Sequence, residues 1–351
     1  MRLSQDQRHK SKEFIERGED EPPQRGLNMG DMQETTNSNS AGPEPTLSYE
    51  QFQWTAGWHI PPSLKRALPR PIIDGLQALK GRILTRDFPR DTVFEQSPED
   101  ALASGSLSIV VPIHDAPAVT RRCLASLEQY APRAEIVLVD DGSRLVETEA
   151  LIRKFVGRNG WKFIIHENPL GHSMACGAGA GLATRPYLCL LNSDTVVTPW
   201  CWRLVKTVFE SEENIVIAGP STSNSGNVQT LPDAGYLRRY LNDNQICEFA
   251  KRLLKECRDP IVSDLPWISG FAFFIRRDIW NQLGGFDRNL PDYGNEVELC
   301  QRVEARGNRK VWIRNAYIHH FGRQSYGEAI GEEAIHSRIQ AARARLKHEA
   351  D

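Results

Sequence analysis

Two polar groups have the residue types of a metal-binding site. Asn192 and Asp194 directly follow the apolar run 187–191, and His319 and His320 stand side by side late in the chain. A carboxylate at a strand end can hold a divalent cation, which neutralises the dense negative charge of a leaving diphosphate. A histidine can complete such a site. Taken alone, Asp194 more often caps a helix, here one that starts at Pro199, and adjacent histidines are more often exposed or satisfied in the core.

A second acidic group follows another apolar run, at residues 139–143 (Val-Asp-Asp-Gly-Ser). A carboxylate in this place can accept a hydrogen bond from the N–H of a pyrimidine, and Gly142 lets the backbone approach a ligand. In isolation the same residues more often form an Asp-Gly turn that caps the next helix.

Residues 295–298 (Asn-Glu-Val-Glu) place two carboxylates at the expected start of a helix. Two residues apart on a helix, Glu296 and Glu298 point to different sides, so we expect only one to face a binding crevice. A carboxylate near an acceptor hydroxyl can remove its proton. Alone, acidic residues in a first turn more often serve only to favour the helix dipole.

The apolar pattern predicts strands that alternate with helices between residues 107 and 191. Runs of β-branched and aliphatic residues are typical of buried parallel strands, and helical spacing marks the segments between them. This alternation implies an α/β fold with right-handed crossovers, in which ligands bind beyond the carboxyl ends of the strands. We therefore expect Asp115, Asp140 and Asp194 to meet at one crevice. The predicted strands are 107–113, 134–139, 161–166 and 187–191, and the predicted helices are 117–130, one ending near 156, and 171–183.

The pattern beyond residue 192 is less regular. We expect a polar loop at 221–226, strands at 215–219, 267–275 and 310–313, and helices at 236–256 and 295–306.

Composition divides the chain into four parts. Residues 1–48 are rich in Gln, Glu, Asn, Ser, Gly and Pro, which predicts a disordered tail. Residues 49–106 are expected to form a partly helical N-terminal extension, 107–327 a single α/β domain, and 328–351 a C-terminal helix. Within the extension, the basic and apolar run 64–86 suits either an anionic membrane surface or a helical segment packed on the domain. Two interrupting prolines favour the second interpretation.

Bulk properties limit the function and location of the chain. A net charge of −2 gives no reason to expect nucleic acid as a partner. No stretch approaches the roughly 18–20 apolar residues that span a bilayer, and residues 1–12 lack the apolar core of a signal peptide. We expect a cytoplasmic protein, with peripheral contact at the inner face of the membrane as a further possibility. The seven cysteines form no CxxC pair, which disfavours a disulfide framework and a zinc site.

The joint pattern resembles the inverting family-2 glycosyltransferases. These have the GT-A fold, a Rossmann-like α/β domain with a mainly parallel central sheet. Eight landmarks stand in family order and at family-like spacing, over roughly residues 107–327, about two thirds of the chain. They are 107–113, 139–143, 167–171 (Glu-Asn-Pro-Leu-Gly), 190–195 (Leu-Leu-Asn-Ser-Asp-Thr), 267–271 (Trp-Ile-Ser-Gly-Phe), 284–287 (Gly-Gly-Phe-Asp), 293–296 (Tyr-Gly-Asn-Glu) and 320–322 (His-Phe-Gly).

The resemblance implies roles for the donor side of the crevice. Asp140 would contact the base of the nucleotide. Asp194 would hold Mn²⁺ or Mg²⁺ against the diphosphate, and His320 would complete the metal or diphosphate site. The other residues expected to bind the donor are Pro112, Asp115, Gly171 and Asn192.

On the acceptor side, the resemblance implies that Ser269 and Gly270 line the pocket and that Glu296 is the catalytic base. The family's usual Glu-Asp dyad is here Asn295-Glu296, and Glu298 is the reserve candidate. The segment 175–179 lacks the Asn-Arg pair that often stands near this position, which alters the expected contacts to the diphosphate or the sugar.

The function that follows is a metal-assisted transfer of a sugar from a UDP- or dTDP-sugar to an acceptor hydroxyl, with inversion, in polysaccharide or glycolipid synthesis. The expected acceptor is a glycan, a lipid-linked molecule or a small molecule. One alternative is a catalytically inactive family member that acts as a scaffold or regulator. Another is a sugar nucleotidyltransferase, which residues 112–117 disfavour because they contain neither Gly nor Lys.

Overall fold

The computed structural model describes residues 94–231, 241–254 and 259–322, together with positions 69, 71, 72, 79, 234 and 340. The expected tail 1–48 lies outside the described residues. So do nearly all of the basic run 64–86 and of the C-terminal helix 328–351.

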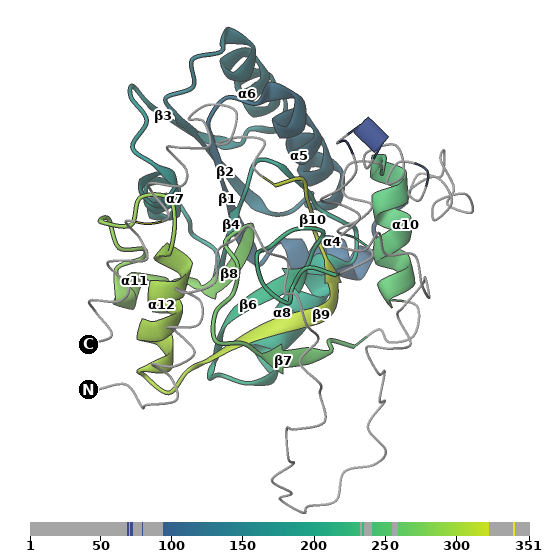
Figure 1. Ribbon diagram of the computed structural model, residues 1–351, viewed down its shortest axis with the longest axis vertical. Coiled ribbons are helices and arrows are strands. Elements are labelled where there is room, and N and C mark those ends of the chain that lie inside the picture. Colours follow the sequence, from purple (N-terminus) through teal and green to yellow (C-terminus); the bar gives the residue numbers. More distant parts are fainter. Residues whose placement is uncertain are drawn as a thin grey trace, which may run out of the picture.

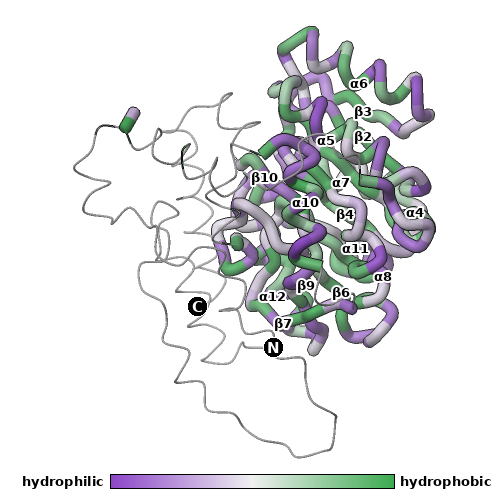
Figure 2. The backbone as a smooth tube through the Cα atoms, turned by 90° about the vertical axis from the view of Figure 1, so that its right-hand side faces the viewer, coloured by the Kyte–Doolittle hydropathy of each residue, from purple (hydrophilic) through white to green (hydrophobic). Residues whose placement is uncertain are grey.

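An eight-stranded sheet runs through the middle of the described chain, in the strand order β3-β2-β1-β4-β8-β6-β9-β7 (Figure 1). Short apolar runs form most of its strands, so hydrophobic residues concentrate along them (Figure 2). The strands are β1 (Leu107–Ile113), β2 (Glu135–Asp141), β3 (Lys162–His166), β4 (Tyr187–Leu191), β6 (Ile215–Ser221), β7 (Val262–Asp264), β8 (Ala272–Arg276) and β9 (Arg309–Tyr317).

The half of the sheet from β3 to β4 is entirely parallel. β1 and β4 are buried at every position, as expected for strands covered on both faces. Pro112 is tolerated in β1 because the pairing with β4 extends only as far as Val110, so the missing N–H costs no bond to β4.

The other half of the sheet is mixed. β8 runs antiparallel to β4 and β6, and β7 runs antiparallel to β9, whereas β9 is parallel to β6. The remaining strands share one direction, so the predicted α/β fold with a mainly parallel sheet is confirmed. The apolar pattern did not predict the reversed direction of β8.

Helices cover both faces of the sheet, and alternate residues of the strands feed the two layers. One layer packs α5 (Pro117–Tyr130), α6 (Val146–Asn159) and α8 (Cys201–Ser211) on side chains such as Ile109 of β1. The opposite layer packs α7 (His172–Gly181), α11 (Arg277–Leu283) and α12 (Asn295–Glu304) on side chains such as Val110. Figure 1 shows α5 and α6 apart from the group of α7, α11 and α12.

The small residues of α7 allow it to lie very close to the sheet. A Cβ on Gly179 would stand 2.3 Å from Val110 and 3.0 Å from Val139. Because such contacts are too short for any side chain, the glycine sets the approach of α7 to β1 and β2. The start of α7 is thereby held near the carboxyl end of β2.

A second sheet of two short strands completes the arrangement around the crevice. β5 (Thr195–Val196) pairs antiparallel with β10 (His319–His320), so that His320 lies opposite Thr195. α10 (Asp243–Leu254) packs beside this pair in an apolar cluster that includes Val196 and Tyr317. The small sheet joins the end of β4 to the segment after β9.

The predicted elements agree best where the apolar pattern is strong. The expected 117–130 and 187–191 are α5 and β4 with the same ends. The strand expected at 267–275 begins later, as β8, and the strand expected at 310–313 extends further, as β9. The elements that the pattern did not predict are α4 (Pro98–Ser104), α11, β5, β7 and β10.

α4 attaches the end of the N-terminal extension to the domain. Asp100 is buried, and its carboxylate accepts the backbone N–H of Arg203, in the first turn of α8, over 3.0 Å. Phe94 packs edge-on against Trp200 at 5.8 Å between ring centroids. α8 is thus capped from α4 and not by Asp194, which excludes the helix-cap interpretation of that carboxylate for this helix.

The six cysteines within the described residues are buried thiols without a disulfide. Burial raises the pKa of Cys247 to about 11 and that of Cys300 to about 12. Among the described helices, none combines the length and the apolar composition that a membrane crossing requires.

Candidate active site

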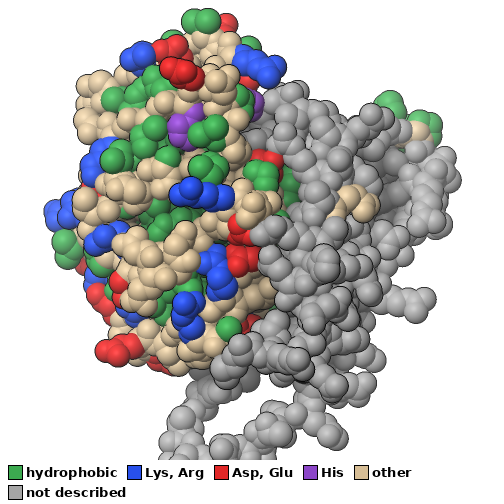
Figure 3. All heavy atoms as spheres, turned by 90° about the vertical axis from the view of Figure 1, so that its left-hand side faces the viewer, with side chains coloured by type: hydrophobic (Ala, Val, Ile, Leu, Met, Phe, Trp, Pro, Cys, Tyr) green, Lys and Arg blue, Asp and Glu red, His purple; other side chains and the backbone are tan. Residues whose placement is uncertain are grey.

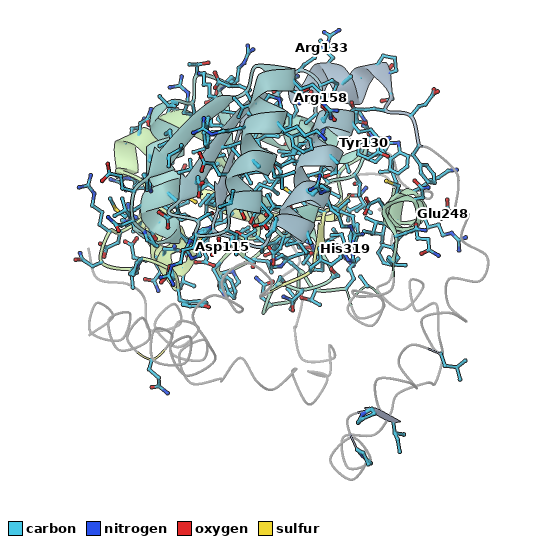
Figure 4. The ribbon with its side chains drawn as sticks, turned by 90° about the horizontal axis from the view of Figure 1, so that it is seen from above. Asp115, Tyr130, Arg133, Arg158, Glu248 and His319 are labelled. Atoms are coloured by element: carbon cyan, nitrogen blue, oxygen red, sulfur yellow. The ribbon has the colours of Figure 1, made fainter. Side chains whose placement is uncertain are left out.

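The carboxyl ends of β1, β2 and β4 bring the expected site residues to one edge of the sheet. Figure 4 shows Asp115 and His319 on the same side of the molecule, opposite Arg133, which precedes β2. Asp140 lies at the end of β2 and Asn192 directly after β4. These residues therefore share the edge of the sheet at which the strand pattern predicts a binding crevice.

The two aspartates at the end of β2 have different surroundings. Asp141 accepts the backbone N–H groups of Leu170 and Gly171, each over 2.9 Å, and bonds to His166 over 2.8 Å. Its carboxylate thus holds the turn before α7. Asp140 is also buried, but the bond it accepts, from the N–H of Ser143 over 2.9 Å, engages Oδ1 alone.

Asp115 links the loop after β1 to the loop before α6 by hydrogen bonds. Its Oδ1 accepts the N–H groups of Arg144 and Leu145 over 2.8 and 2.9 Å, and its own N–H donates to Ser143 Oγ over 2.9 Å. Asp115 and Ala116 both adopt positive φ, 54° and 52°, which is a strained conformation for residues other than glycine. The carboxylate expected to line the base pocket thus bonds to the backbone at the start of α6.

Asn192, Asp194 and His320 come together as the sequence predicts. His320 Nε2 lies 3.1 Å from Asp194 Oδ1 and 3.4 Å from Asn192 Nδ2. All three side chains belong to backbone that is tied in place, because Asn192 N–H donates to Phe271 O and Phe321 N–H donates to Asp194 O, each over 2.9 Å. The β5–β10 pairing is what carries the histidine to this carboxylate.

The hydrogen bonds of His320 set which ring nitrogen faces Asp194. Nδ1 lies 2.6 Å from the carbonyl oxygen of Asn224, which only accepts, so Nδ1 carries the proton. In the neutral ring, Nε2 then presents a lone pair toward Asp194. Phe271 stacks on the ring at 5.4 Å and holds its plane. A histidine oriented in this way by a backbone carbonyl is ready to bind a metal.

The paired histidines have separate functions. His319 is buried and bonds to the hydroxyl of Tyr317 over 2.9 Å, within the apolar cluster beside α10. It is the core-satisfied histidine that the sequence left open, whereas His320 is the one at the crevice.

A divalent cation suits the oxygen and nitrogen donors of this cluster. Asp194 supplies a hard carboxylate oxygen and His320 an oriented imidazole nitrogen, a set that Mn²⁺ and Mg²⁺ accept. Among the described residues there is no group of three or more His, Cys, Asp or Glu side chains that could hold a metal ion alone. Asp194 and His320 are thus two candidate metal ligands within the part of the chain that the structure describes.

Gly171 has a packing function. Its φ is +94°, and a Cβ there would stand 3.0 Å from Pro291 Cβ and 3.2 Å from Asp292 Oδ1. The first N–H groups of α7 are already used, because His172 donates to Asp292 Oδ1 over 3.3 Å and Ser173 to Pro291 O over 2.7 Å. The glycine lets the loop before α12 close over the start of α7.

The two residues expected on the acceptor side, Ser269 and Gly270, have different structural functions. Ser269 donates its hydroxyl to Ser225 O over 2.9 Å and its N–H to Gln229 Oε1 over 2.8 Å, so it fixes the loop 223–229. Gly270 instead makes room, because a Cβ on it would stand only 3.0 Å from Glu296 Oε1. Ser269 acts through the loop, and Gly270 borders the candidate base.

The structure separates the two candidate bases. Glu298 forms a two-point ion pair with Arg302, at 2.5 Å from both Nε and Nη2, and this arginine also bonds to Leu283 O and Gly285 O. Glu298 therefore anchors α12 to the turn after α11. Glu296 lies beside Gly270, whose neighbour Phe271 contacts Asn192 and His320. Glu296 and Glu298 thus have different surroundings, as their helical spacing predicts, and Glu296 stays the candidate base.

His172 is a residue of the crevice that the sequence did not single out. It forms a side-chain hydrogen bond with Asn192, and its Nε2 lies 3.6 Å from Cys176 Sγ. Burial lowers the pKa of His172, although the charge of Asp292 opposes the shift, so the ring is neutral near pH 7. Its position directly after Gly171 in a recognised landmark was the available signal.

Apolar surface borders the crevice at the turn before α7. Ile165 of β3 and Leu170 are exposed by 47% and 48%. Figure 3 shows hydrophobic side chains beside a histidine on this face, with Lys and Arg side chains around them. Apolar side chains are therefore exposed at the turn before α7.

Three curated relatives are similar to parts of the chain. The O-antigen biosynthesis protein RfbC of Myxococcus xanthus is 27% identical over 64% of this chain and 18% of its own length. Polypeptide N-acetylgalactosaminyltransferase 8 of Drosophila melanogaster is 28% identical over 62% of this chain and 38% of its own length. N-acetylglucosaminyl-diphospho-decaprenol L-rhamnosyltransferase of Mycobacterium tuberculosis is 30% identical over 21% of this chain and 24% of its own length. The chain thus spans well under half the length of these relatives.

A crystal structure of GalNAc-T7 with UDP, GalNAc and Mn²⁺ covers 72% of this chain and 52% of its own, with 18% identity and a TM-score of 0.48. The family model described as Glycosyl transferase family 2 matches residues 108–284, which is about half of the chain. The match includes nearly all of β1, all of β4 and the Asn192–Asp194 motif. The resemblance in the motifs is thereby confirmed, and the chain belongs to glycosyl transferase family 2.

Proposed function

We propose that this chain is a metal-assisted, inverting glycosyltransferase that moves a sugar from a UDP- or dTDP-sugar to an acceptor hydroxyl. The observation that carries the proposal is the meeting of three groups at one edge of the sheet. Asp194 and His320 form the proposed metal-binding pair, and Glu296 lies beside Gly270, whose neighbour Phe271 stacks on His320. Membership in the family supplies the reaction class.

On the donor side, Asp140 would read the base and the Asp194–His320 pair would hold the diphosphate. Oδ1 of Asp140 accepts the N–H of Ser143, so Oδ2 is the atom that would meet the N–H of a uracil or thymine. Asp194 and His320 would hold Mn²⁺ or Mg²⁺. When bound, the cation neutralises the charge that builds up on the departing diphosphate. Asn192, which is expected to contact the donor, lies beside the pair, with its Nδ2 3.4 Å from His320 Nε2.

On the acceptor side, Glu296 would act as the general base. Its carboxylate would take the proton of the acceptor hydroxyl while the oxygen attacks the anomeric carbon from the face opposite the diphosphate. One such displacement inverts the configuration at the anomeric carbon and needs no covalent enzyme intermediate. Gly270, which lacks a side chain, leaves room for this carboxylate.

The names of two relatives suggest the class of the acceptor. RfbC is named for O-antigen biosynthesis and the mycobacterial relative for a lipid diphosphate acceptor, and both are similar to this chain. We therefore favour a glycan or lipid-linked acceptor in polysaccharide or glycolipid synthesis over a small molecule. A cytoplasmic location, with peripheral membrane contact, accords with such an acceptor.

The decisive experiment is substitution of Glu296, after a screen of nucleotide-sugars with Mn²⁺ has identified the donor. Glu296→Gln keeps the size of the side chain but removes the base, so turnover should fall at least 100-fold while donor affinity stays within about twofold. Glu298→Gln is the matched control. It should lose stability, because Arg302 loses its partner, but keep the turnover of the folded protein.

Two outcomes would contradict the proposal. Normal turnover in Glu296→Gln would show that another group is the base. A wild-type protein that releases no nucleoside diphosphate from any donor with Mn²⁺ would favour the inactive scaffold that the Asn295-Glu296 pair left open.

A further inference from the structure

The residue before Glu296 belongs to a buried pair of polar side chains. Asn295 is 2% exposed at the first position of α12, and Ser173 is 4% exposed near the start of α7. Asn295 Nδ2 donates to Ser173 Oγ over 2.7 Å, and Asn295 Oδ1 accepts the backbone N–H of Glu296 over 2.8 Å. Both halves of the amide are therefore engaged, one toward α7 and one toward Glu296.

The hydrogen bonds of Ser173 require a donor at position 295. The hydroxyl donates to Leu290 O, and the backbone N–H donates to Pro291 O over 2.7 Å. A hydroxyl has a single hydrogen, so Ser173 meets Asn295 through a lone pair. A carboxylate at position 295 would either face that lone pair or take the hydrogen away from Leu290 O. Only an amide supplies the donor and the acceptor that this position uses.

The Glu296 carboxylate lies close to the backbone of Gly270. Its Oε1 lies 3.0 Å from the place where a Cβ on Gly270 would stand, and its Cδ lies 3.4 Å from the same place. A shift of the first turn of α12 would therefore move the carboxylate toward or away from the loop 269–271. Displacements of about 1 Å at a reacting group can lower a rate about 100-fold.

We propose that Asn295 and Ser173 form a positioning clamp that fixes the start of α12 against α7 and so places the Glu296 carboxylate. This inference rests on the proposed function of Glu296. Neither residue touches the reacting atoms, so both act through Glu296 as positioning residues. The clamp also accounts for the asparagine at the first place of the dyad, because a glutamate there has no group to donate to Ser173.

The test is Asn295→Asp in the full chain, assayed with the donor found in the nucleotide-sugar screen. The substitution keeps the shape of the side chain and removes the donor. We expect kcat per folded molecule to fall at least tenfold. KM for the donor, and the affinity for nucleoside diphosphate with Mn²⁺, should change less than about twofold, because Asp140 and the Asp194–His320 pair are untouched. A merely structural residue would lower the melting temperature and leave kcat per folded molecule unchanged.

Two further variants make the test specific. Asn281→Asp introduces the same charge at an exposed position of α11 and should leave kcat unchanged. Ser173→Ala removes the other half of the clamp and should lower kcat with the same unchanged donor KM. Both substitutions remove the same hydrogen bond between Asn295 and Ser173. The fall in kcat of the double variant should therefore be smaller than the product of the two separate falls. If Asn295→Asp does not fold, Ser173→Ala decides the question.

The outcomes separate this inference from the proposed function. If kcat stays within twofold of wild type in Asn295→Asp, or in a folded Ser173→Ala, while Glu296→Gln is inactive, the clamp is wrong and the base is right. Strictly multiplicative losses would also overturn the clamp. A wild-type chain that transfers no sugar would overturn the proposed function and the clamp with it.

Discussion

At the scale of single residues, the fold itself uses many of the polar groups at the crevice. Asp141 bonds to the turn before α7, Asp115 caps α6 across the pocket, and Ser269 holds the loop 223–229. We assign the binding and chemistry to a smaller set, in which Asp194 and Glu296 are the principal carboxylates. A polar residue in a recognised motif can therefore serve the site by shaping it.

Gly270 gives a test of how closely the candidate base is packed. In Gly270→Ala the new Cβ would stand 3.0 Å from Glu296 Oε1, which forces the carboxylate to shift by a few tenths of an ångström. We expect the protein to fold with nearly the wild-type melting temperature and kcat to fall about tenfold, since reacting groups tolerate little displacement. Steady-state kinetics with a calorimetric melting curve would measure both.

Gly181→Ala is the control for this substitution. A Cβ there meets nothing within 4 Å, and the residue is exposed at the end of α7. The control should keep full activity. Wild-type kcat in Gly270→Ala would mean that Glu296 is not the group that sets the rate.

The sequence could predict which residues gather, but not which atoms remain for a ligand. The strand-end positions of Asp140, Asn192 and Asp194 follow from the apolar runs before them. That Ser269 turns its hydroxyl toward Ser225 O depends on a loop 44 positions away. Motif spacing contains no information on such long-range bonds, and this is why His172 and the use of Asn295 were not foreseen.

At the scale of elements, the junction of α4 and α8 contains a carboxylate in an unfavourable place. Burial raises the pKa of Asp100 to about 6, although the N–H of Arg203 and the hydroxyl of Ser97 favour its charged form. The folded state thus holds this proton more tightly than the unfolded state. Stability from this group is present below the unfolded pKa of 3.8 and is lost as the pH rises toward about 6.

Replacing this carboxylate by an amide should remove the pH dependence. Asn at position 100 can still accept the N–H of Arg203 but carries no charge. We expect Asp100→Asn to raise the free energy of unfolding by roughly 1–3 kcal/mol near pH 7.5, which is several degrees in melting temperature, with little gain near pH 4.5. Calorimetry at both values would measure the difference. A lower melting temperature at both would mean that the charged cap outweighs the cost of burial.

Element prediction succeeded where one apolar period dominates and failed where pairing decides. α5 and β4 begin and end as predicted, because their apolar residues follow a helical and a strand pattern, respectively. β5 and β10 have two residues each, too few to show any period. The direction of β8 depends on the chain connection and not on its own composition, so the antiparallel pairs with β4 and β6 had to come from the structure.

At the scale of the whole molecule, ligand and metal should stabilise the fold together. A ligand that binds only the folded state adds about 2.7 kcal/mol at 100 times its dissociation constant. UDP or dTDP with Mn²⁺ should therefore raise the melting temperature by roughly 5–10 °C. Asp194→Asn should abolish the Mn²⁺-dependent part of this shift, because the carboxylate of the pair is lost.

Asp264→Asn provides the matched control for the thermal-shift experiment. Asp264 lies on β7, is exposed and forms an ion pair with Arg309. It is far from the carboxyl ends of β1, β2 and β4. This variant should keep the full shift. An equal Mn²⁺-dependent shift in Asp194→Asn would place the metal elsewhere.

The pairing of β5 with β10 also has a consequence for how the chain acquires its site during synthesis. The two halves of the proposed metal-binding pair come from distant segments, since Asp194 and His320 are 126 positions apart. Contacts of such separation form late, because the intervening chain must first be ordered. The proposed nucleotide site around Asp140 would depend on segments that emerge from the ribosome well before residue 320. Nucleotide recognition is therefore expected to mature before metal binding, so that an unfinished chain is able to hold a base but not to activate a donor.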